Sequence, residues 1–165
     1  MAFKHLKKFF IPRFDWRYLL RVLLVAAIAF VIFKYIAPPF YVRGDSMLPR
    51  YETGDVTLGW RGAYAFSEPE RGDIVIIRLA GRQISLLKRI VALPGETVAF
   101  KDGNLFIDGE RLLEPYVKKS CNWSLEPRKV DRGHYYVVGD NRSTSIEEHV
   151  FGQVEEERII GIPLW

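Results

Sequence analysis

Two short segments of the chain carry residues that together could perform acyl-transfer chemistry. Ser46 lies in Gly44-Asp45-Ser46-Met47-Leu48-Pro49, a turn-forming segment between a glycine and a proline, and Lys88 lies in the apolar segment 83–92. A serine hydroxyl becomes a useful nucleophile when a base removes its proton, and a neutral lysine amine can be that base. A Ser-Lys pair is an established variant of the nucleophile–base arrangement.

The position of Lys88 gives it a reason to be neutral. In an extended strand it shares one face with Ile84, Leu86 and Ile90, which are all apolar. Burial disfavours the ammonium form, so we expect the pKa of Lys88 to fall toward neutrality. From this segment alone, a lysine that reaches solvent or forms a salt bridge is the alternative. For Ser46 the alternative is a hydroxyl that caps its own turn.

The segments that must position these residues have the sequence pattern of a β domain. After Pro39, short β-branched or aromatic runs alternate with turns rich in Gly, Pro and Asp, and 102–103 and 108–109 are both Asp-Gly hairpin signals. No long helical pattern follows Pro39, so we expect a mainly β, antiparallel domain. The polar region 118–133 is expected to be a long surface loop. The expected strands are 55–58, 73–79, 83–92, 97–101, 104–107, 135–138 and 158–163.

The N-terminal region predicts a membrane anchor. Residues 18–36 are apolar apart from Arg21 and Lys34, and these 19 residues come close to the roughly 20 that cross a bilayer. Residues 1–21 hold six basic groups and one acid, which favours a cytosolic N-terminus. The alternatives are a buried helix of a soluble domain and a cleaved signal peptide. We therefore expect a single-pass protein of the cell membrane, with a basic cytosolic tail (1–17), a transmembrane helix (18–37) and an extracytoplasmic catalytic β domain (38–165).

Composition disfavours several other classes of protein. Beyond residue 21 the chain has 18 basic and 19 acidic residues, so the main domain lacks the basic excess that nucleic-acid binding needs. Cys121 is the one cysteine, which excludes an intrachain disulfide. The three histidines are scattered without the spacing of metal ligands. We expect no metal, no other cofactor and no nucleic-acid partner.

A third segment turns these separate observations into a pattern. Gly139-Asp140-Asn141-Arg142, followed by Ser145, continues from a predicted strand into a polar turn that could reach the same site. With this segment the chain resembles the type I signal peptidases, or leader peptidases, which are membrane-anchored Ser-Lys proteases. Four blocks follow the N-terminal anchor in the family's order and cover nearly the whole chain. They are 44–49, 71–75, 88–96 and 139–145.

The resemblance implies a function and roles for particular residues. Ser46 is the expected nucleophile and Lys88 the general base of an endopeptidase that removes signal peptides from exported preproteins after small residues, through an acyl-enzyme. Ser145 stands at the position of a serine that orients the lysine. Asp140 and Arg142 are expected to support the site, and the expected partners are preprotein signal peptides and the lipid bilayer. The family-matched candidates for substrate binding are Tyr41, Val42, Ile84 and Leu86.

The sequence also departs from the family pattern at several positions. Gly44 stands where some members carry a hydroxyl that helps bind the oxyanion, and Arg50 replaces the usual threonine after the proline. Glu147 and His149 stand where an Asp/Arg ion pair is expected, and histidine is fully charged only below a pKa near 6.5. Two alternatives follow: a conjugation- or pilin-type Ser-Lys processing peptidase, and a non-catalytic, membrane-tethered β domain that binds peptides. A self-cleaving repressor is disfavoured by the anchor and by the lack of a DNA-binding region.

Overall fold

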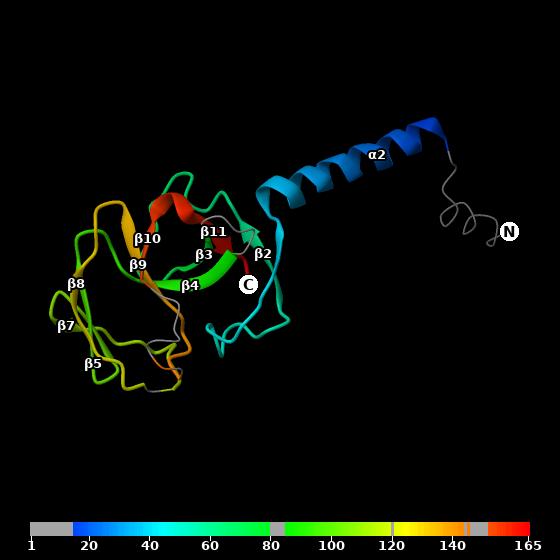
Figure 1. Cartoon of the computed structure of the whole chain (residues 1–165). Helices are drawn as coiled ribbons and strands as arrows, with labels where there is room; N and C mark the ends of the chain where they lie inside the picture. The colour runs from blue at the N-terminus through cyan, green and yellow to red at the C-terminus, as the bar shows by residue number, and fades with distance from the viewer. Residues whose placement is uncertain (1–14, 80–84, 120, 144, 146–151) are drawn as a thin grey trace.

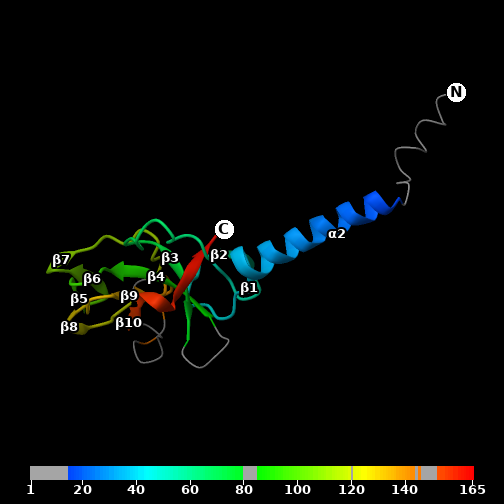
Figure 2. The same cartoon turned by 90° about the horizontal axis from the view of Figure 1, so that it is seen from above.

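A long helix projects from a β body in the computed structural model, which describes residues 15–79, 85–119, 121–143, 145 and 152–165 (Figures 1 and 2). The helix consists of α2 (Trp16–Val31) and a π-helical turn, η1 (Ile32–Ile36), and none of its side chains is buried. Together the two parts form a 21-residue helix that is long and apolar enough to cross a membrane. An all-round apolar and exposed surface is what a lipid-facing helix requires.

The β body consists of two antiparallel sheets, as the described residues show. The larger sheet has the strand order β1-β2-β11-β3-β4-β9-β10, and the smaller has the order β7-β6-β5-β8. The predicted fold class, mainly antiparallel β after an N-terminal helix, is confirmed. The strands are β1 (Pro39–Tyr41), β2 (Val56–Trp60), β3 (Ile74–Arg78), β4 (Ser85–Ala92), β5 (Thr97–Lys101), β6 (Asn104–Ile107), β7 (Glu110–Arg111), β8 (Leu125–Lys129), β9 (His134–Val138), β10 (Gly152–Glu155) and β11 (Ile159–Pro163), with a 3-10 turn, η2 (Glu156–Arg158), before β11.

Two Asp-Gly pairs form the hairpins of the smaller sheet. Asp102 and Gly103 join β5 to β6 with φ angles of 48° and 76°, and Asp108 and Gly109 join β6 to β7 with φ angles of 52° and 86°. Positive φ at both central residues is the signature of the type I′ turn, whose twist matches that of the paired strands. Both predicted hairpin turns are confirmed.

The prediction of a continuous loop over 118–133 is wrong, because β8 lies within it. This strand pairs with β5 at the edge of the smaller sheet. Only Leu125 of the strand is even partly buried, and Pro127 interrupts the run, so no alternating pattern marks it in the sequence. Edge strands tolerate proline, since one of their sides needs no ladder hydrogen bonds.

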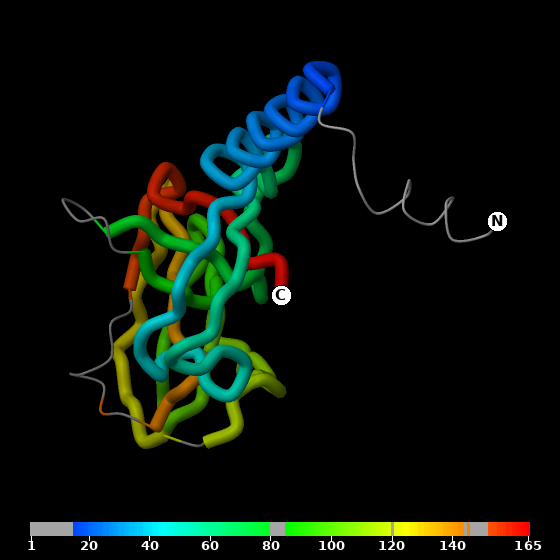
Figure 3. Tube along the Cα trace, turned by 90° about the vertical axis from the view of Figure 1, so that its right-hand side faces the viewer, coloured from blue at the N-terminus to red at the C-terminus, as the bar shows by residue number. Residues whose placement is uncertain are grey.

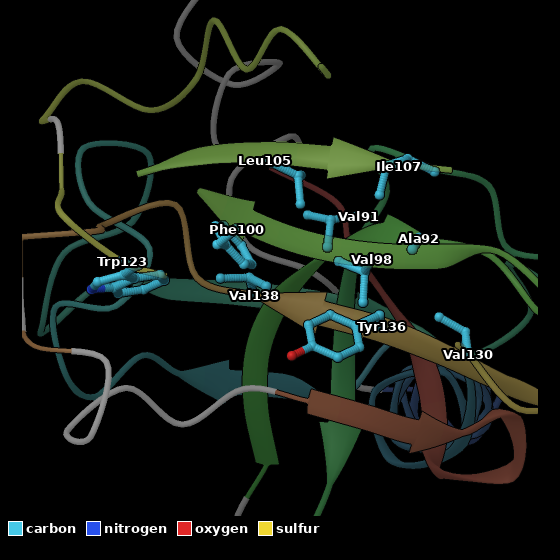
Figure 4. Close-up of a cluster of buried hydrophobic side chains, with 10 residues drawn as sticks. All are labelled: Val91, Ala92, Val98, Phe100, Leu105, Ile107, Trp123, Val130, Tyr136 and Val138. Carbon is cyan, nitrogen blue, oxygen red and sulfur yellow. The ribbon is translucent and has the colours of Figure 1, made fainter. Parts of the chain in front are cut away.

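Strand β4 is buried on both faces, and this is why it reads as a continuous apolar run. Ile90 belongs to a cluster with residues of β3 and β9, whereas Val91 belongs to a second cluster against the smaller sheet. In that second cluster Phe100 and Trp123 meet edge to face, with ring centroids 5.7 Å apart (Figure 4). Its buried members are Val91, Ala92, Val98, Phe100, Leu105, Ile107, Trp123, Val130, Tyr136 and Val138.

The helix is joined to the β body by hydrogen bonds as well as by the chain. Arg61 N–H donates to the carbonyl of Ile36 (3.0 Å), and Gly59 N–H donates to the carbonyl of Pro38 (2.9 Å). From the helix the chain runs along the body as β1, turns back, and returns as β2 (cyan in Figure 3). The end of the helix and the start of β1 are therefore fixed to the end of β2.

Gly103 and Gly109 offer a matched test of the hairpin geometry. A methyl group at Gly103 would collide with the backbone carbonyl of Cys121, whereas one at Gly109 would meet no atom within 4 Å. We expect Gly109→Ala to lower the free energy of unfolding by about 1–2 kcal/mol, the cost of a left-handed residue with a side chain. Gly103→Ala should cost clearly more. Urea unfolding of the full chain in detergent measures both, and equal losses would contradict the predicted collision.

Candidate active site

Ser46 lies in the turn between β1 and β2, and its side chain is half-buried. The turn begins at Gly44, whose φ of 87° lies in the left-handed region that glycine favours. Gly44 N–H donates to Thr53 Oγ1 (3.0 Å), and Thr53 Oγ1 donates to Asp45 Oδ1 (2.9 Å). Met47 is 2% exposed and anchors the turn in the hydrophobic interior. The hydrogen bonds of Thr53 on one side of Ser46 and the buried Met47 on the other therefore hold it in place.

Asn141 fastens this turn to the segment that follows β9. Its backbone N–H donates to the Ser46 carbonyl (3.0 Å), and its Nδ2 donates to the Asp45 carbonyl (2.9 Å). Two bonds to consecutive carbonyls fix the orientation of the peptide groups on both sides of the Ser46 Cα atom. The sequence placed Asn141 in the fourth block, 139–145, but gave it no role.

Lys88 lies in β4 and is 3% exposed. It pairs with Val75 of β3 and is buried, as the apolar face of its strand predicts. Burial lowers the pKa of Lys88 from its ordinary value of 10.5 to about 8, while the nearby Asp140 carboxylate acts in the opposite direction. A substantial fraction of Lys88 is therefore neutral near pH 8, as a general base must be.

Asp140 lies near Lys88 and is neutralised by Arg89. Arg89 Nε donates to Asp140 Oδ1 (2.8 Å) and Nη2 donates to Oδ2 (2.6 Å), a two-pronged ion pair. A third bond runs from Arg89 Nη1 to the Gly72 carbonyl (2.6 Å). This pair ties β4, which carries Lys88, to the segment whose Asn141 holds the Ser46 turn. That Asp140 supports the site stays a prediction, and the contact through which it could do so is this pair with Arg89.

Arg142 anchors the other end of the same segment in the hydrophobic core. Its Nη2 and Nη1 donate to the two oxygens of Glu114 (2.6 and 3.1 Å), and its Nε donates to the Gly139 carbonyl (2.8 Å). The guanidinium also lies over the rings of Phe100 and Trp123, at 5.4 and 5.6 Å. These hydrogen bonds and ring contacts offset the cost of removing the Arg142 charge from water.

Tyr116 connects these two ion pairs. Its hydroxyl donates to Glu114 Oε1 (2.7 Å), and the Arg89 guanidinium lies 4.0 Å from the centre of its ring. Burial and the adjacent Glu114 carboxylate raise the pKa of Tyr116, so it remains a protonated donor. Neither Glu114 nor Tyr116 was predicted, because a single acid and a single tyrosine in a polar stretch carry no pattern.

A groove opens beside Ser46 between the β1 segment and β4. Three of the four predicted substrate-binding residues fall in the described part of the chain, and all three line this groove: Tyr41, Val42 and Leu86. The fourth, Ile84, lies outside the described residues. We call it the substrate groove for its predicted role, and its lining is Phe40, Tyr41, Val42, Arg43, Gly44 and Ser46 on one side, and Ile76, Ser85, Leu86 and Leu87 on the other.

Other predicted features of the site stay predictions. Ser145 is exposed and stands between positions outside the described part of the chain, so its contact with Lys88 stays a prediction. Glu147 and His149 also lie outside the described residues. Within the described residues, no group of three His, Cys, Asp or Glu side chains could hold a metal ion.

Comparison with known proteins identifies the family. A model of the family described as "Signal peptidase, peptidase S26" matches residues 15–164. The chain belongs to this signal peptidase family. It is 33% identical over 153 residues to a probable signal peptidase I-1 of Synechocystis, covering 87% of this chain and 78% of that protein. It is 34% identical over 151 residues to signal peptidase I T of Bacillus subtilis, covering 85% and 78%.

A solved structure was also found in the signal peptidase family. It is that of a signal peptidase I from Enterococcus faecalis, with 30% identity and a TM-score of 0.47, covering 58% of this chain and 97% of that chain. The family match and the sequence relatives confirm the predicted resemblance and with it signal-peptidase function. They also support the broader prediction of a serine endopeptidase.

The buried Arg142–Glu114 pair makes a testable contribution to stability. Glu114→Gln leaves the Arg142 charge buried without a counter-ion, and we expect it to lower the free energy of unfolding by about 3 kcal/mol. Glu155→Gln, which breaks the exposed pair with Arg158 (3.4 Å), is the matched control and should cost less than about 0.5 kcal/mol. Thermal or urea unfolding distinguishes them. Similar losses would show that burial does not make the Glu114 pair special.

Proposed function

We propose that the chain cleaves signal peptides from exported preproteins, with Ser46 as nucleophile and Lys88 as general base. The observation that carries this proposal is the buried Lys88, whose pKa is lowered to about 8, in a strand tied through Asp140 and Asn141 to the turn of Ser46. A base with a pKa near the pH of the reaction has a substantial neutral fraction and still binds a proton strongly enough to remove it from the hydroxyl.

The reaction would proceed by acyl transfer. Neutral Lys88 Nζ takes the proton of Ser46 Oγ, and Oγ attacks the scissile carbonyl carbon. The ammonium of Lys88 then protonates the leaving amine as the peptide bond breaks. The neutral amine of Lys88 then deprotonates a water molecule, which attacks the ester carbonyl. The signal peptide is released with a new carboxylate, and Ser46 Oγ regains its proton from Lys88.

The oxyanion would be stabilised by the backbone of the turn. None of the hydrogen bonds among the described residues uses the N–H of Ser46, so this donor is free for the developing negative charge. The two bonds from Asn141 hold the neighbouring carbonyls and thereby fix the direction of that N–H. Gly44 has no hydroxyl to add a second donor from its side chain.

The substrate groove suits an extended peptide. Strand β1 lies at the edge of the larger sheet, and the pairing of β4 with β9 begins only at Arg89, so residues 85–87 have one unpaired side among the described strands. A peptide between these two edges can form main-chain hydrogen bonds with the enzyme. Val42 and Leu86 give the groove apolar walls that would favour small side chains next to the scissile bond.

The proposed topology places this site at the outer surface of the membrane. In it, residues 1–17 remain in the cytosol, residues 18–37 cross the bilayer, and residues 38–165 form the catalytic domain outside. The length and hydropathy of the helix Trp16–Ile36 support the membrane span, and the basic groups of residues 1–21 support its orientation. A signal peptide held in the same bilayer would bring its cleavage site to the enzyme.

Single substitutions at the two proposed catalytic residues should abolish cleavage without unfolding the protein. We expect Ser46→Ala and Lys88→Met each to lower kcat/KM on a secretory precursor by at least about 10³-fold. The controls Ser67→Ala and Lys101→Met change exposed residues of the same types and should retain activity. Persistent cleavage by Ser46→Ala would show that another group is the nucleophile. A wild-type protein that binds the precursor but never cleaves it would instead be a peptide-binding β domain.

The lowered pKa of Lys88 predicts how activity and stability depend on pH. Only the neutral amine accepts a proton, so kcat/KM should fall about tenfold per pH unit below about pH 8. In the unfolded chain Lys88 has its ordinary pKa of 10.5, so between about pH 8 and 10.5 the unfolded state binds more protons. The contribution of Lys88 to stability therefore rises with pH across this window, and Lys88→Met should remove that rise. A rate that is constant from pH 5 to 8 would contradict lysine as the base.

A further inference from the structure

A second cavity meets the Ser46 turn at different residues from the substrate groove. The groove meets the turn at Gly44 and Ser46, whereas this cavity meets it at Leu48 and Pro49. Asn141 lines the cavity and also donates its N–H to the Ser46 carbonyl (3.0 Å), so the cavity begins next to the nucleophile. We call it the exit pocket, and its lining residues are Leu48, Pro49, Lys118, Lys119, Asp140 and Asn141.

Among the described residues, nothing compensates the positive charge of the exit pocket. Lys118 and Lys119 are both exposed, and neither forms an ion pair with a described residue. Lys118 Nζ donates to a neutral acceptor, the Pro115 carbonyl (3.0 Å). Asp140 also lines the pocket, but both of its oxygens accept hydrogen bonds from Arg89. The two ammonium groups are therefore free to act on a ligand that enters the pocket.

We propose that the exit pocket receives the first residues of the mature protein, and that Lys118 and Lys119 favour acidic side chains at these positions. The inference rests on the proposed function, because it requires the signal-peptide side of the substrate to occupy the groove. A peptide that crosses Ser46 from the groove then continues toward Leu48 and Asn141. Its next one or two side chains come within reach of the lysines, so these residues would determine specificity on the mature side.

The size of the effect follows from the exposure of both lysines. Exposed ion pairs are weak individually, so two of them should favour an acidic over a basic substrate by about tenfold at low ionic strength. Salt screens charges separated by more than about 10 Å at 0.1 M, and this preference should shrink as salt is added. A preference that came from shape alone would not respond to salt.

The test compares precursors that differ only in the first two residues after the scissile bond, which are Glu-Glu, Gln-Gln or Lys-Lys. The readout is the ratio of kcat/KM for the Glu and Lys substrates, measured on the full chain in detergent at low and high salt. We expect a ratio of about ten for wild type at low salt, a ratio near one for Lys118→Gln/Lys119→Gln, and inversion for Lys118→Glu/Lys119→Glu. The control Lys101→Glu/Lys129→Glu makes the same charge change on exposed residues of the smaller sheet and should keep the wild-type ratio.

The outcomes separate this inference from the function on which it rests. A wild-type ratio near one at low salt, or an equal change in the Lys101/Lys129 control, overturns the charge preference. In either case cleavage that is lost in Ser46→Ala still supports the proposed function. If wild type cleaves none of the three precursors, the proposed function fails, and the inference fails with it.

Discussion

The ion pair between Arg89 and Asp140 holds the proposed active site together. It joins strand β4 to the segment after β9, and these two elements carry Lys88 and the residue that fastens the Ser46 turn. The two side chains are 11% and 1% exposed. Loss of one partner from a buried pair leaves the other charge without compensation, so substitution of either Arg89 or Asp140 should be destabilising. The position of the proposed nucleophile, Ser46, relative to the proposed base, Lys88, thus depends on a contact that includes neither of them.

The same ion pair also affects the chemistry of the base. A carboxylate beside a buried lysine would normally stabilise the ammonium and keep its pKa high. Here both oxygens of Asp140 accept hydrogen bonds from Arg89, and the effect of burial on Lys88 exceeds that of the carboxylate. Arg142 and Glu114 form a second buried ion pair, which anchors the same segment in the core. Position and basicity therefore depend on one network.

The sequence predicted the elements that have a local signal and missed those defined by distant partners. The Asp-Gly turns and the apolar strand of Lys88 are local patterns, and the order of the blocks indicated which residues belong together. Strand β8 has neither alternation nor burial, so nothing in its own residues distinguishes it from a loop. Glu114 matters only because Arg142 reaches it from 28 positions away. Asn141 donates through its backbone N–H and its side-chain amide to two carbonyls about 95 positions away, and no local pattern reveals such acceptors.

The unpaired edges that border the substrate groove have a consequence for the shape of the enzyme–substrate complex. The strands β1, β2, β11, β3 and β4 follow one another in the sheet, and the groove lies between the first and the last of them. A bound peptide would therefore pair with both edges as an additional strand and close these strands into a small barrel. Most of its contacts would be with the peptide backbone, which is the same in every precursor. One site could then accept many sequences, with side chains tested only where the barrel is narrowest.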